Sequence, residues 1–334
     1  MRENEVLQSI SNELNRLSGH LGFYYKNLST GYEYGIRADE EYLAASVIKF
    51  PLLLHVLKQA AEGKIDLYHK LPVKEDEKCP SCGALYLILG EYEVEIRSLC
   101  RLMIAISDNT ATNMLLRYCT IDGVNEGFAE MGLNKTKVRR LLFDSEAAAR
   151  GLENTICPQE MAMLLEQLHR GTFVNEEVSR YALDILLLQQ INHKMKGKLA
   201  GKAKVAHKTG EDYMLSNDVG IVYAPQPFVI CFSGHVAIVE EIAADGSYIR
   251  CSESDWSGPA FTYRTRYLAN NWQLKDKNIF QGFIYNSYEP GPGPGPGPDP
   301  PVPPGPEPVN HFKWWITKWQ ILRKKEGGIN HVQL

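Results

Sequence analysis

The chain has 334 residues, of which 44% are hydrophobic and 23% are charged, and its formal net charge is −4. A chain of this length has room for one domain of about 230 residues with smaller parts beside it. The slightly acidic balance gives no general attraction to nucleic acid. The sequence contains no apolar run of about 18 residues or more, so no transmembrane helix is expected.

The N-terminal residues predict a polar amphipathic helix over residues 4–17, followed by strands over residues 21–26 and 32–36. A mostly helical block is expected from residue 46 to about residue 192. The chain starts with MRENE, which lacks the apolar core of a secretory signal. We therefore expect a cytoplasmic protein, or a cell-envelope protein if the gene start is incomplete.

The first of three short motifs is Ser46-Val47-Ile48-Lys49, which opens an apolar segment that predicts a helix over residues 46–57. A serine hydroxyl is a weak nucleophile until a neighbouring base takes its proton. Lys49 lies three residues after Ser46, so both side chains share one helix face. A lysine buried beneath a pocket can have its pKa lowered far enough to act as that base. The alternative is that Ser46 only caps the helix.

Two further motifs follow along the chain. Ser107-Asp108-Asn109 precedes a helical pattern, so it either contributes to a site or supplies the cap of an ordinary helix. Lys208-Thr209-Gly210 closes an alternating run over residues 204–209, which predicts a strand. The glycine at its end lets a ligand approach the backbone closely.

These motifs, their order and their separations resemble the catalytic set of the serine penicillin-recognising enzymes, the class A β-lactamases and penicillin-binding proteins. The resemblance covers residues 1–233 and implies an α+β fold. In that fold a five-stranded antiparallel sheet lies beside an all-helical region, with the site in the cleft between them. Strands over residues 217–223 and 228–232 complete the expected sheet, and the family's usual last helix is not predicted.

The resemblance also implies a role for each motif residue. Ser46 is the expected nucleophile and Lys49 its base, while Ser107 passes a proton toward the leaving group. Lys208 and Thr209 are expected to bind a substrate carboxylate. The other expected contacts are Asn109, which positions the substrate amide, Gly210, which the substrate approaches, and the backbone N–H groups of Ser46 and Glu211, which stabilise the oxyanion.

Class A β-lactamases activate the deacylating water with a glutamate, and counting back from Pro158 without gaps places Leu141 at that position. Asp144 and Glu146 are the nearest carboxylates, and the alternative for both is a solvated loop acid. The expected substrate is a β-lactam or a D-alanyl-type amide of peptidoglycan. Three interpretations stay open: an active hydrolase, a penicillin-binding sensor that acylates and stalls, and a cell-wall-associated module. No cofactor, metal or nucleic acid is expected, and the oligomeric state is left open.

Seven cysteines in a chain without an export signal favour free thiols over a disulfide framework. Cys79-Pro80-Ser81-Cys82 is a single CxxC pair, and a structural zinc ion needs four ligands. We expect a plain loop here, with metal binding or redox use as the alternative.

Residues 234–288 change to short strands and turns and resemble the C-terminal half of a CHAP amidase domain, which cuts peptidoglycan. His235 matches the catalytic histidine of that family and Glu253 matches the residue that orients it, while the nucleophilic cysteine has no counterpart. A Cys–His pair cannot form without its thiolate. We therefore expect an inactive half-domain that begins with two strands joined by a turn at Asp245-Gly246.

The C-terminal residues divide into a linker and a tail. Residues 289–309 hold eleven of the 18 prolines, so they predict an extended, disordered linker. Residues 310–334 combine tryptophans such as Trp315 and Trp319 with several lysines at helical spacing. This pattern predicts either a weak membrane or cell-wall contact or a weakly helical tail without one.

Overall fold

The computed structural model describes residues 3–16, 20–199, 201–212, 215–235, 238–242, 248–253 and 262–267. The chain divides into two units, Met1–Tyr285 and Asn286–Leu334, and every described residue belongs to the first. The expected linker and basic tail therefore lie outside the described residues. Among the residues that are described, no helix is both long and apolar enough to cross a membrane.

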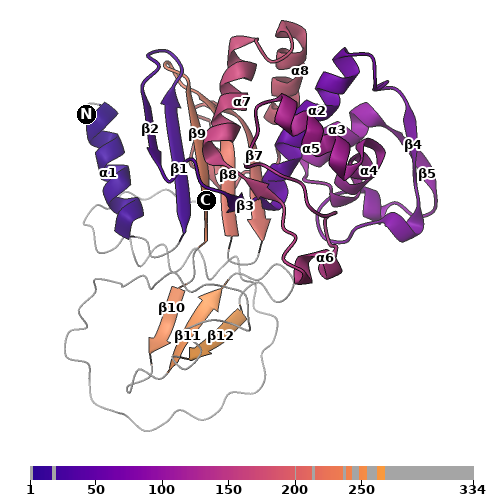
Figure 1. Cartoon of the computed structure of the whole chain (residues 1–334). Coiled ribbons are helices and arrows are strands. Elements are labelled where there is room, and N and C mark those ends of the chain that lie inside the picture. Colours follow the sequence, from indigo (N-terminus) through magenta and orange to yellow (C-terminus); the bar gives the residue numbers. More distant parts are fainter. Residues whose placement is uncertain are drawn as a thin grey trace, which may run out of the picture. The chain divides into compact units, whose positions relative to one another are not determined.

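A five-stranded sheet forms one layer of the fold (Figure 1). Neighbouring strands are antiparallel throughout. The N-terminal hairpin pairs with the last of the five strands along the chain. This confirms the five-stranded antiparallel sheet that the resemblance implied, and it leaves the Lys208 strand at one edge. In spatial order the strands are β2 (Glu33–Ile36), β1 (Leu21–Asn27), β9 (Phe228–His235), β8 (Leu215–Tyr223) and β7 (Lys204–Asp212).

Helices cover the face of the sheet that carries the hydrophobic core. α7 packs against β1, β8 and β9, and α8 packs against β7 and α2, so the core is continuous between the two layers. The helices are α2 (Lys49–Ala61), α3 (Ile96–Ala105), α4 (Asn109–Cys119), α5 (Ile121–Glu130), α6 (Ser145–Ala149), α7 (Pro158–Arg170), α8 (Glu176–Leu187) and α9 (Met195–Lys198).

The N-terminal helix α1 (Glu3–Arg16) agrees with the prediction and is joined to β1 by polar contacts. Tyr25 Oη donates to the Glu3 carboxylate at 2.5 Å, and Asn27 Nδ2 donates to the same oxygen at 3.0 Å. These two hydrogen bonds fix the start of the chain to the second strand of the sheet.

Two small strand pairs were not predicted, one inside the block expected to be mostly helical and one that joins this block to the residues just before it. β3 (Tyr42–Leu43) pairs with β6 (Thr155–Ile156), and β4 (Lys70–Val73) pairs with β5 (Tyr92–Glu95). Strands this short carry too little alternation to be recognised in a sequence. The β3–β6 pair matters for the site, because it anchors the chain just before Ser46.

The helix predicted to begin at Ser46 begins three residues later. Residues Ala45–Ile48 form a 3₁₀ turn, η1, and α2 starts at Lys49. Pro51 has no N–H to donate and therefore suits the first turn of an α-helix. The interpretation of Ser46 as a helix cap is wrong, since Ala44 and Ile48 hold the cap positions of η1 and α2.

A separate three-stranded antiparallel sheet follows β9, in the order β10 (Ile238–Ile242), β11 (Tyr248–Glu253) and β12 (Thr262–Tyr267). β10 and β11 agree with the two predicted strands, and the predicted turn at Asp245-Gly246 lies outside the described residues. β12 was not predicted. By backbone pairing His235 belongs to β9 of the large sheet, opposite Leu215, while Glu253 ends β11. The CHAP-like interpretation of this region stays a prediction.

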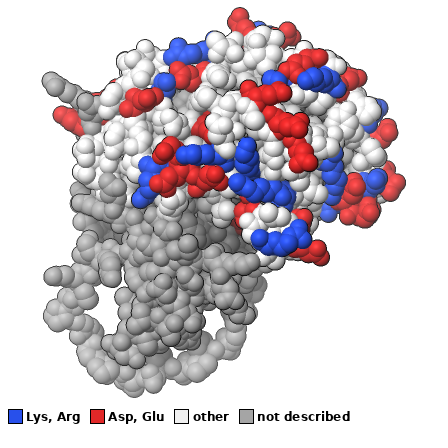
Figure 2. All heavy atoms as spheres, viewed as in Figure 1, with Lys and Arg blue, Asp and Glu red and all other residues white. Residues whose placement is uncertain are grey.

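Charged side chains of both signs alternate over the face of the described residues in Figure 2. Many of them form ion pairs, such as Lys58 with Glu62 at 2.6 Å and Lys26 with Glu166 at 2.7 Å. This mixture agrees with the small net charge of the chain.

Candidate functional site

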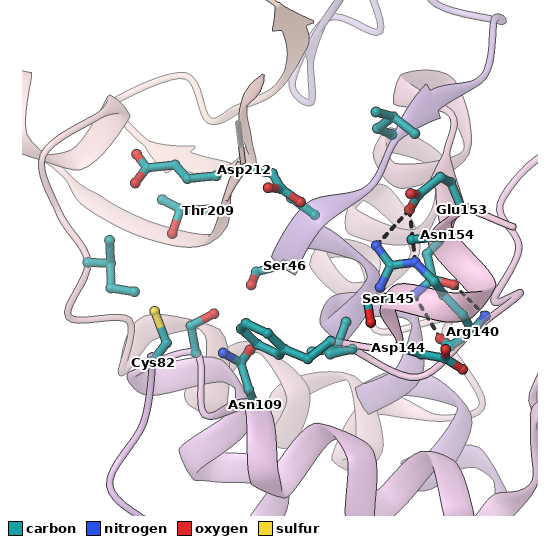
Figure 3. Close-up of a pocket in the computed structure, with 18 residues that line it drawn as sticks. Ser46, Cys82, Asn109, Arg140, Asp144, Ser145, Glu153, Asn154, Thr209 and Asp212 are labelled. Atoms are coloured by element: carbon teal, nitrogen blue, oxygen red, sulfur yellow. Dashed lines mark hydrogen bonds and ion pairs between the residues drawn. The ribbon is translucent and has the colours of Figure 1, made fainter. Parts of the chain in front are cut away.

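A cavity of about 540 Å³ opens where η1, the turn before α4, the end of β7 and the loop before α7 meet. Figure 3 shows Ser46 directed into this space, with Asn109 and Cys82 on one wall and Thr209 on another. The structure therefore brings residues of all three motifs to one place. The predicted site residues that line the cavity are Ser46, Ser107, Asn109, Asp144, Thr209 and Glu211.

Lys49 lies beneath the cavity, with its side chain fully buried. Its Nζ lies 2.9 Å from Ser46 Oγ and 2.9 Å from Ser107 Oγ. It donates to the backbone oxygen of Ser107 at 2.8 Å and to Oδ1 of Asn109 at 2.7 Å. The ammonium or amine of Lys49 thus connects the first motif to the second across 58 to 60 residues of chain.

Burial lowers the pKa of Lys49 to about 7, so a large part of this side chain is uncharged at neutral pH. An uncharged amine has two N–H donors and one lone pair. The two oxygens that only accept, Ser107 O and Asn109 Oδ1, take the two N–H groups. The lone pair then faces the hydroxyl groups, including that of Ser46.

The second motif both caps a helix and places side chains at the cavity, which are the two alternatives that the sequence left open. Asp108 caps α4, since its Oδ1 accepts from the N–H of Ala111 at 2.9 Å. Its Oδ2 accepts from the N–H groups of Ala84 and Leu85, at 2.7 and 2.9 Å. The cap holds the turn so that its two neighbours, Ser107 and Asn109, both reach Lys49.

The third motif supplies a second buried lysine. Lys208 Nζ donates to Ser107 Oγ at 3.2 Å and to Thr209 O at 2.7 Å. Burial lowers the pKa of Lys208 well below its usual range, and the proximity of Lys49 lowers it further. Ser107 Oγ therefore lies between two amines, which is the arrangement that a proton relay needs.

Glu211 follows the third motif and lies at the edge of the cavity. Its carboxylate pairs with Lys194 at 3.1 Å and is also in contact with His193. Burial raises the pKa of Glu211, but the charge of Lys194 and the hydrogen bond from His193 outweigh burial and leave the pKa below its usual value. The side chain is therefore ionised at neutral pH.

The loop before α7 presents a leucine to the cavity. Leu142 lines the cavity, whereas Leu141, the residue that counting back from Pro158 selected, packs against the hydrophobic core. Asn113 holds Leu142 in this position, because its Oδ1 accepts from Leu142 N at 2.8 Å and its Nδ2 donates to Leu142 O at 2.9 Å. Neither leucine side chain can accept or donate a proton.

The two candidate deacylation acids differ in position. Asp144 lines the cavity, but its Oδ1 caps α6 by accepting from Ala147 N at 2.8 Å. Glu146 is exposed and is not among the residues that line the cavity. Of the two, only Asp144 is near the space in front of Ser46.

Several residues at the site were missed by the sequence analysis, and three of them fix its backbone. Cys82 lines the cavity, and its carbonyl accepts from the N–H of Asn109 at 3.1 Å. Asn154 fixes the loop before α7 by accepting from Arg139 N and Arg140 N, at 2.8 and 3.1 Å. Asn217 is the third, and its buried side chain donates to the backbone just before Ser46. No local pattern marks the two asparagines, because their partners are distant in sequence, and Cys82 was singled out only as part of a CxxC pair.

The Cys79-Pro80-Ser81-Cys82 segment is a loop with free thiols, as expected. Cys79 Sγ accepts from Asn113 Nδ2 at 3.0 Å, and Cys79 N donates to Thr110 Oγ1 at 2.9 Å. The loop is thereby attached to the first turn of α4. Within the described ranges, no group of three or more His, Cys, Asp or Glu side chains is arranged to hold a metal ion.

Residues 5–234 match the family described as "Beta-lactamase enzyme family". The chain belongs to the beta-lactamase enzyme family. It is a β-lactamase-like serine hydrolase, and the match ends within β9, before the three-stranded sheet. Similar sequences include beta-lactamase ROB-1 of Haemophilus influenzae, 26% identical over 229 residues that cover 65% of this chain and 72% of that protein. A beta-lactamase of Mycobacterium tuberculosis is 26% identical over 231 residues, covering 64% and 72%.

Several solved structures share this fold. PBP-A has a TM-score of 0.64 and 29% sequence identity, over 70% of this chain and 88% of that one. A leucine-to-glutamate mutant of PBP-A, solved as an acyl-enzyme complex with penicillin G, gives the same values. An ancestral class A β-lactamase is similar in fold, with a TM-score of 0.63 at 23% identity over 72% of this chain and 93% of that one.

Proposed function

We propose that this protein forms an acyl-enzyme on Ser46 with a β-lactam or a D-alanyl-type amide and releases it slowly. The observation that carries the proposal is the distance of 2.9 Å between Lys49 Nζ and Ser46 Oγ, in a buried position that lowers the pKa of Lys49 to about 7. An uncharged lysine in hydrogen-bond contact with a serine hydroxyl is an activated nucleophile pair.

Acylation then follows from the positions of the side chains. Lys49 takes the proton of Ser46 as Oγ attacks the carbonyl carbon, and the negative charge on the carbonyl oxygen is stabilised by the N–H groups of Ser46 and Glu211. Ser107, between Lys49 and Lys208, passes a proton to the departing nitrogen. Thr209, which lines the cavity, binds the substrate carboxylate with the buried Lys208 behind it, and Asn109 orients the substrate amide.

Slow deacylation is supported by the loop before α7. The cavity wall there is Leu142, which cannot activate water, and the carboxylate of Asp144 is engaged as the cap of α6. A general base commonly contributes a factor of about 10² to 10⁴ to a hydrolytic step. PBP-A, which is similar in fold, has a leucine-to-glutamate mutant that is described as an acyl-enzyme complex with penicillin G, and this supports acylation by a β-lactam in this fold.

Intact-mass spectrometry after exposure to penicillin G tests the proposal, with Ser46→Ala as the control. We expect one adduct that persists after removal of free penicillin, maps to Ser46 and is missing in the control. Rapid return of the unmodified mass with release of hydrolysed penicillin would instead identify an efficient β-lactamase. A folded protein that forms no adduct contradicts the proposal.

A further inference from the structure

The turn that carries Ser46 is held against the sheet by one buried side chain, that of Asn217. Asn217 lies in β8 and is 0% exposed. Its Nδ2 donates to the carbonyl oxygen of Leu43 at 2.9 Å and to that of Ala44 at 3.0 Å. These hydrogen bonds join residues 174 and 173 positions apart, and both acceptors come just before Ser46.

The backbone at this point needs such support. Ala45 has a φ of +41°, a conformation that residues with a side chain rarely adopt. Backbone in such a region persists only when the surrounding structure holds it. The holding contacts are the two bonds from Asn217, the bond from Ala44 N to Asn154 O at 2.9 Å, and the bond from Val47 N to Ala44 O at 3.0 Å.

The same turn lies directly on the strand of the third motif. Asn217 is the register partner of Gly210 in the β7–β8 pair. A Cβ placed on Gly210 would lie 3.0 Å from Ala44 O and 3.1 Å from Val47 N, so the turn and β7 are in close backbone contact. Asn217 therefore reaches past Gly210 and fixes the turn at this contact.

The consequence concerns the oxyanion site. One of its two proposed donors, the N–H of Ser46, belongs to the turn, and the other, the N–H of Glu211, follows Gly210 in β7. The spacing of these donors is set by how the turn sits on β7. We infer that Asn217 is a positioning residue for acylation, which holds the N–H of Ser46 at its working distance from the N–H of Glu211.

This inference rests on the proposed acylation of Ser46, and it assigns Asn217 no contact with substrate. Asn217 is not among the residues that line the cavity. Its loss is expected to affect the chemical step of acylation more than the binding of substrate. A displacement of about 1 Å of a catalytic group can cost about 100-fold in rate.

The test compares Asn217→Ala with a matched asparagine variant of the same sheet. Asn27 lies in β1, is 2% exposed, and accepts from Ser29 N and Thr30 N at 3.0 and 3.1 Å. It lies outside the cavity lining. Asn27→Ala therefore removes a buried asparagine bound to two backbone groups, together with its bonds to Glu3 and Gln226, without touching the Ser46 turn.

The acylation rate constant and the dissociation constant of the preceding complex are measured with penicillin G by stopped flow, and melting temperatures are recorded in parallel. We expect Asn217→Ala to lower the rate constant about 10- to 100-fold with little change in the dissociation constant. Asn27→Ala is expected to lower the melting temperature while the rate constant stays near the wild-type value. Asn217→Ser keeps one hydrogen-bond donor, and its acylation rate constant is expected to lie between those of wild type and Asn217→Ala. This variant replaces Asn217→Ala in the test if the alanine variant does not fold.

Binding of phenylboronic acid, which forms a tetrahedral anionic adduct on a serine, gives a second readout. Its affinity depends on the oxyanion donors, so it is expected to fall in parallel with the rate constant. Equal rate constants in the two alanine variants, or a loss confined to the melting temperature, would overturn the positioning role of Asn217. Neither outcome would bear on the proposed acylation of Ser46. A wild-type protein that forms no penicillin adduct overturns the proposed function and this inference with it. The wild-type measurement alone gives that result, so the two failures can be told apart.

Discussion

Lys49 Nζ lies 2.9 Å from Ser46 Oγ although the two residues belong to different elements, the 3₁₀ turn η1 and the helix α2. The change from one helix type to the other occurs between them and leaves the lysine fully buried under the serine. Burial lowers the pKa of Lys49, and the nearby Cys82 and Asp108 offset this effect only in part. This relationship has consequences for both activity and stability.

Acylation of Ser46 should depend on pH through Lys49. Only the uncharged lysine accepts a proton, and burial lowers its pKa to about 7. We therefore expect the rate of labelling by a fluorescent penicillin to rise between about pH 5.5 and about pH 9. The midpoint of the rise is expected near pH 7. Lys49→Arg, which stays charged throughout this range, should lose labelling at every pH. A rate that is constant or falls across this range would argue against Lys49 as the base.

Burial of Lys49 should lower the free energy of unfolding of the protein at low pH. The pKa of Lys49 is about 7 in the folded protein, and an exposed lysine of the unfolded chain has a pKa of about 10.4. Between these values the unfolded chain binds more protons, so stability rises with pH. We expect Lys49→Met, without activity, to melt higher than wild type near about pH 6 and the difference to shrink toward about pH 9. A difference that does not vary with pH would contradict the burial argument.

Leu142→Glu should shorten the life of the penicillin adduct. The leucine lines the cavity in front of Ser46 and its backbone is fixed by Asn113, so a carboxylate at this position faces the acyl group. We expect an adduct lifetime at least about tenfold shorter, measured by intact mass over time. Leu142→Gln has nearly the same shape without the base and should behave as wild type. Equal lifetimes in the glutamate and glutamine variants would exclude this position for the base.

Asp144→Asn tests the candidate deacylation acid that lines the cavity. Asparagine caps a helix about as well as aspartate, so α6 keeps its N-terminal bond to Ala147. If Asp144 acts only as a cap, the lifetime of the adduct stays unchanged in this variant. A lifetime that increases several-fold would show instead that Asp144 activates the deacylating water.

Gly210→Ala should impair acylation through the backbone. Its Cβ would lie 3.0 Å from Ala44 O and 3.1 Å from Val47 N, so the turn that carries Ser46 must move. We expect acylation to slow by about tenfold or more and stability to fall by about 1–3 kcal/mol. Gly63→Ala is the control, because its φ of +73° is strained for alanine while no atom lies within 4 Å of the new Cβ. Equal acylation rates in the two variants would show that the close contact at Gly210 is unimportant.

The amino-acid sequence by itself determined which strands form, the order of the motifs and the pairing of Ser46 with Lys49. Alternation of apolar residues sets which strands form, and the predicted ranges agree with the five strands of the large sheet. A separation of three residues keeps Ser46 and Lys49 adjacent in either type of helix. These features depend on neighbours along the chain, and so a sequence can reveal them.

The tertiary structure alone decided which groups Lys49 meets and how it titrates. Ser107 and Asn109 reach it across 58 and 60 residues, and Asn217 reaches the Ser46 turn across 174. The tertiary structure also decided that Leu142, and not Leu141, faces the cavity, through two hydrogen bonds from Asn113. Burial and long-range hydrogen bonds arise only when the whole core packs, because solvent is excluded by residues from every part of the domain.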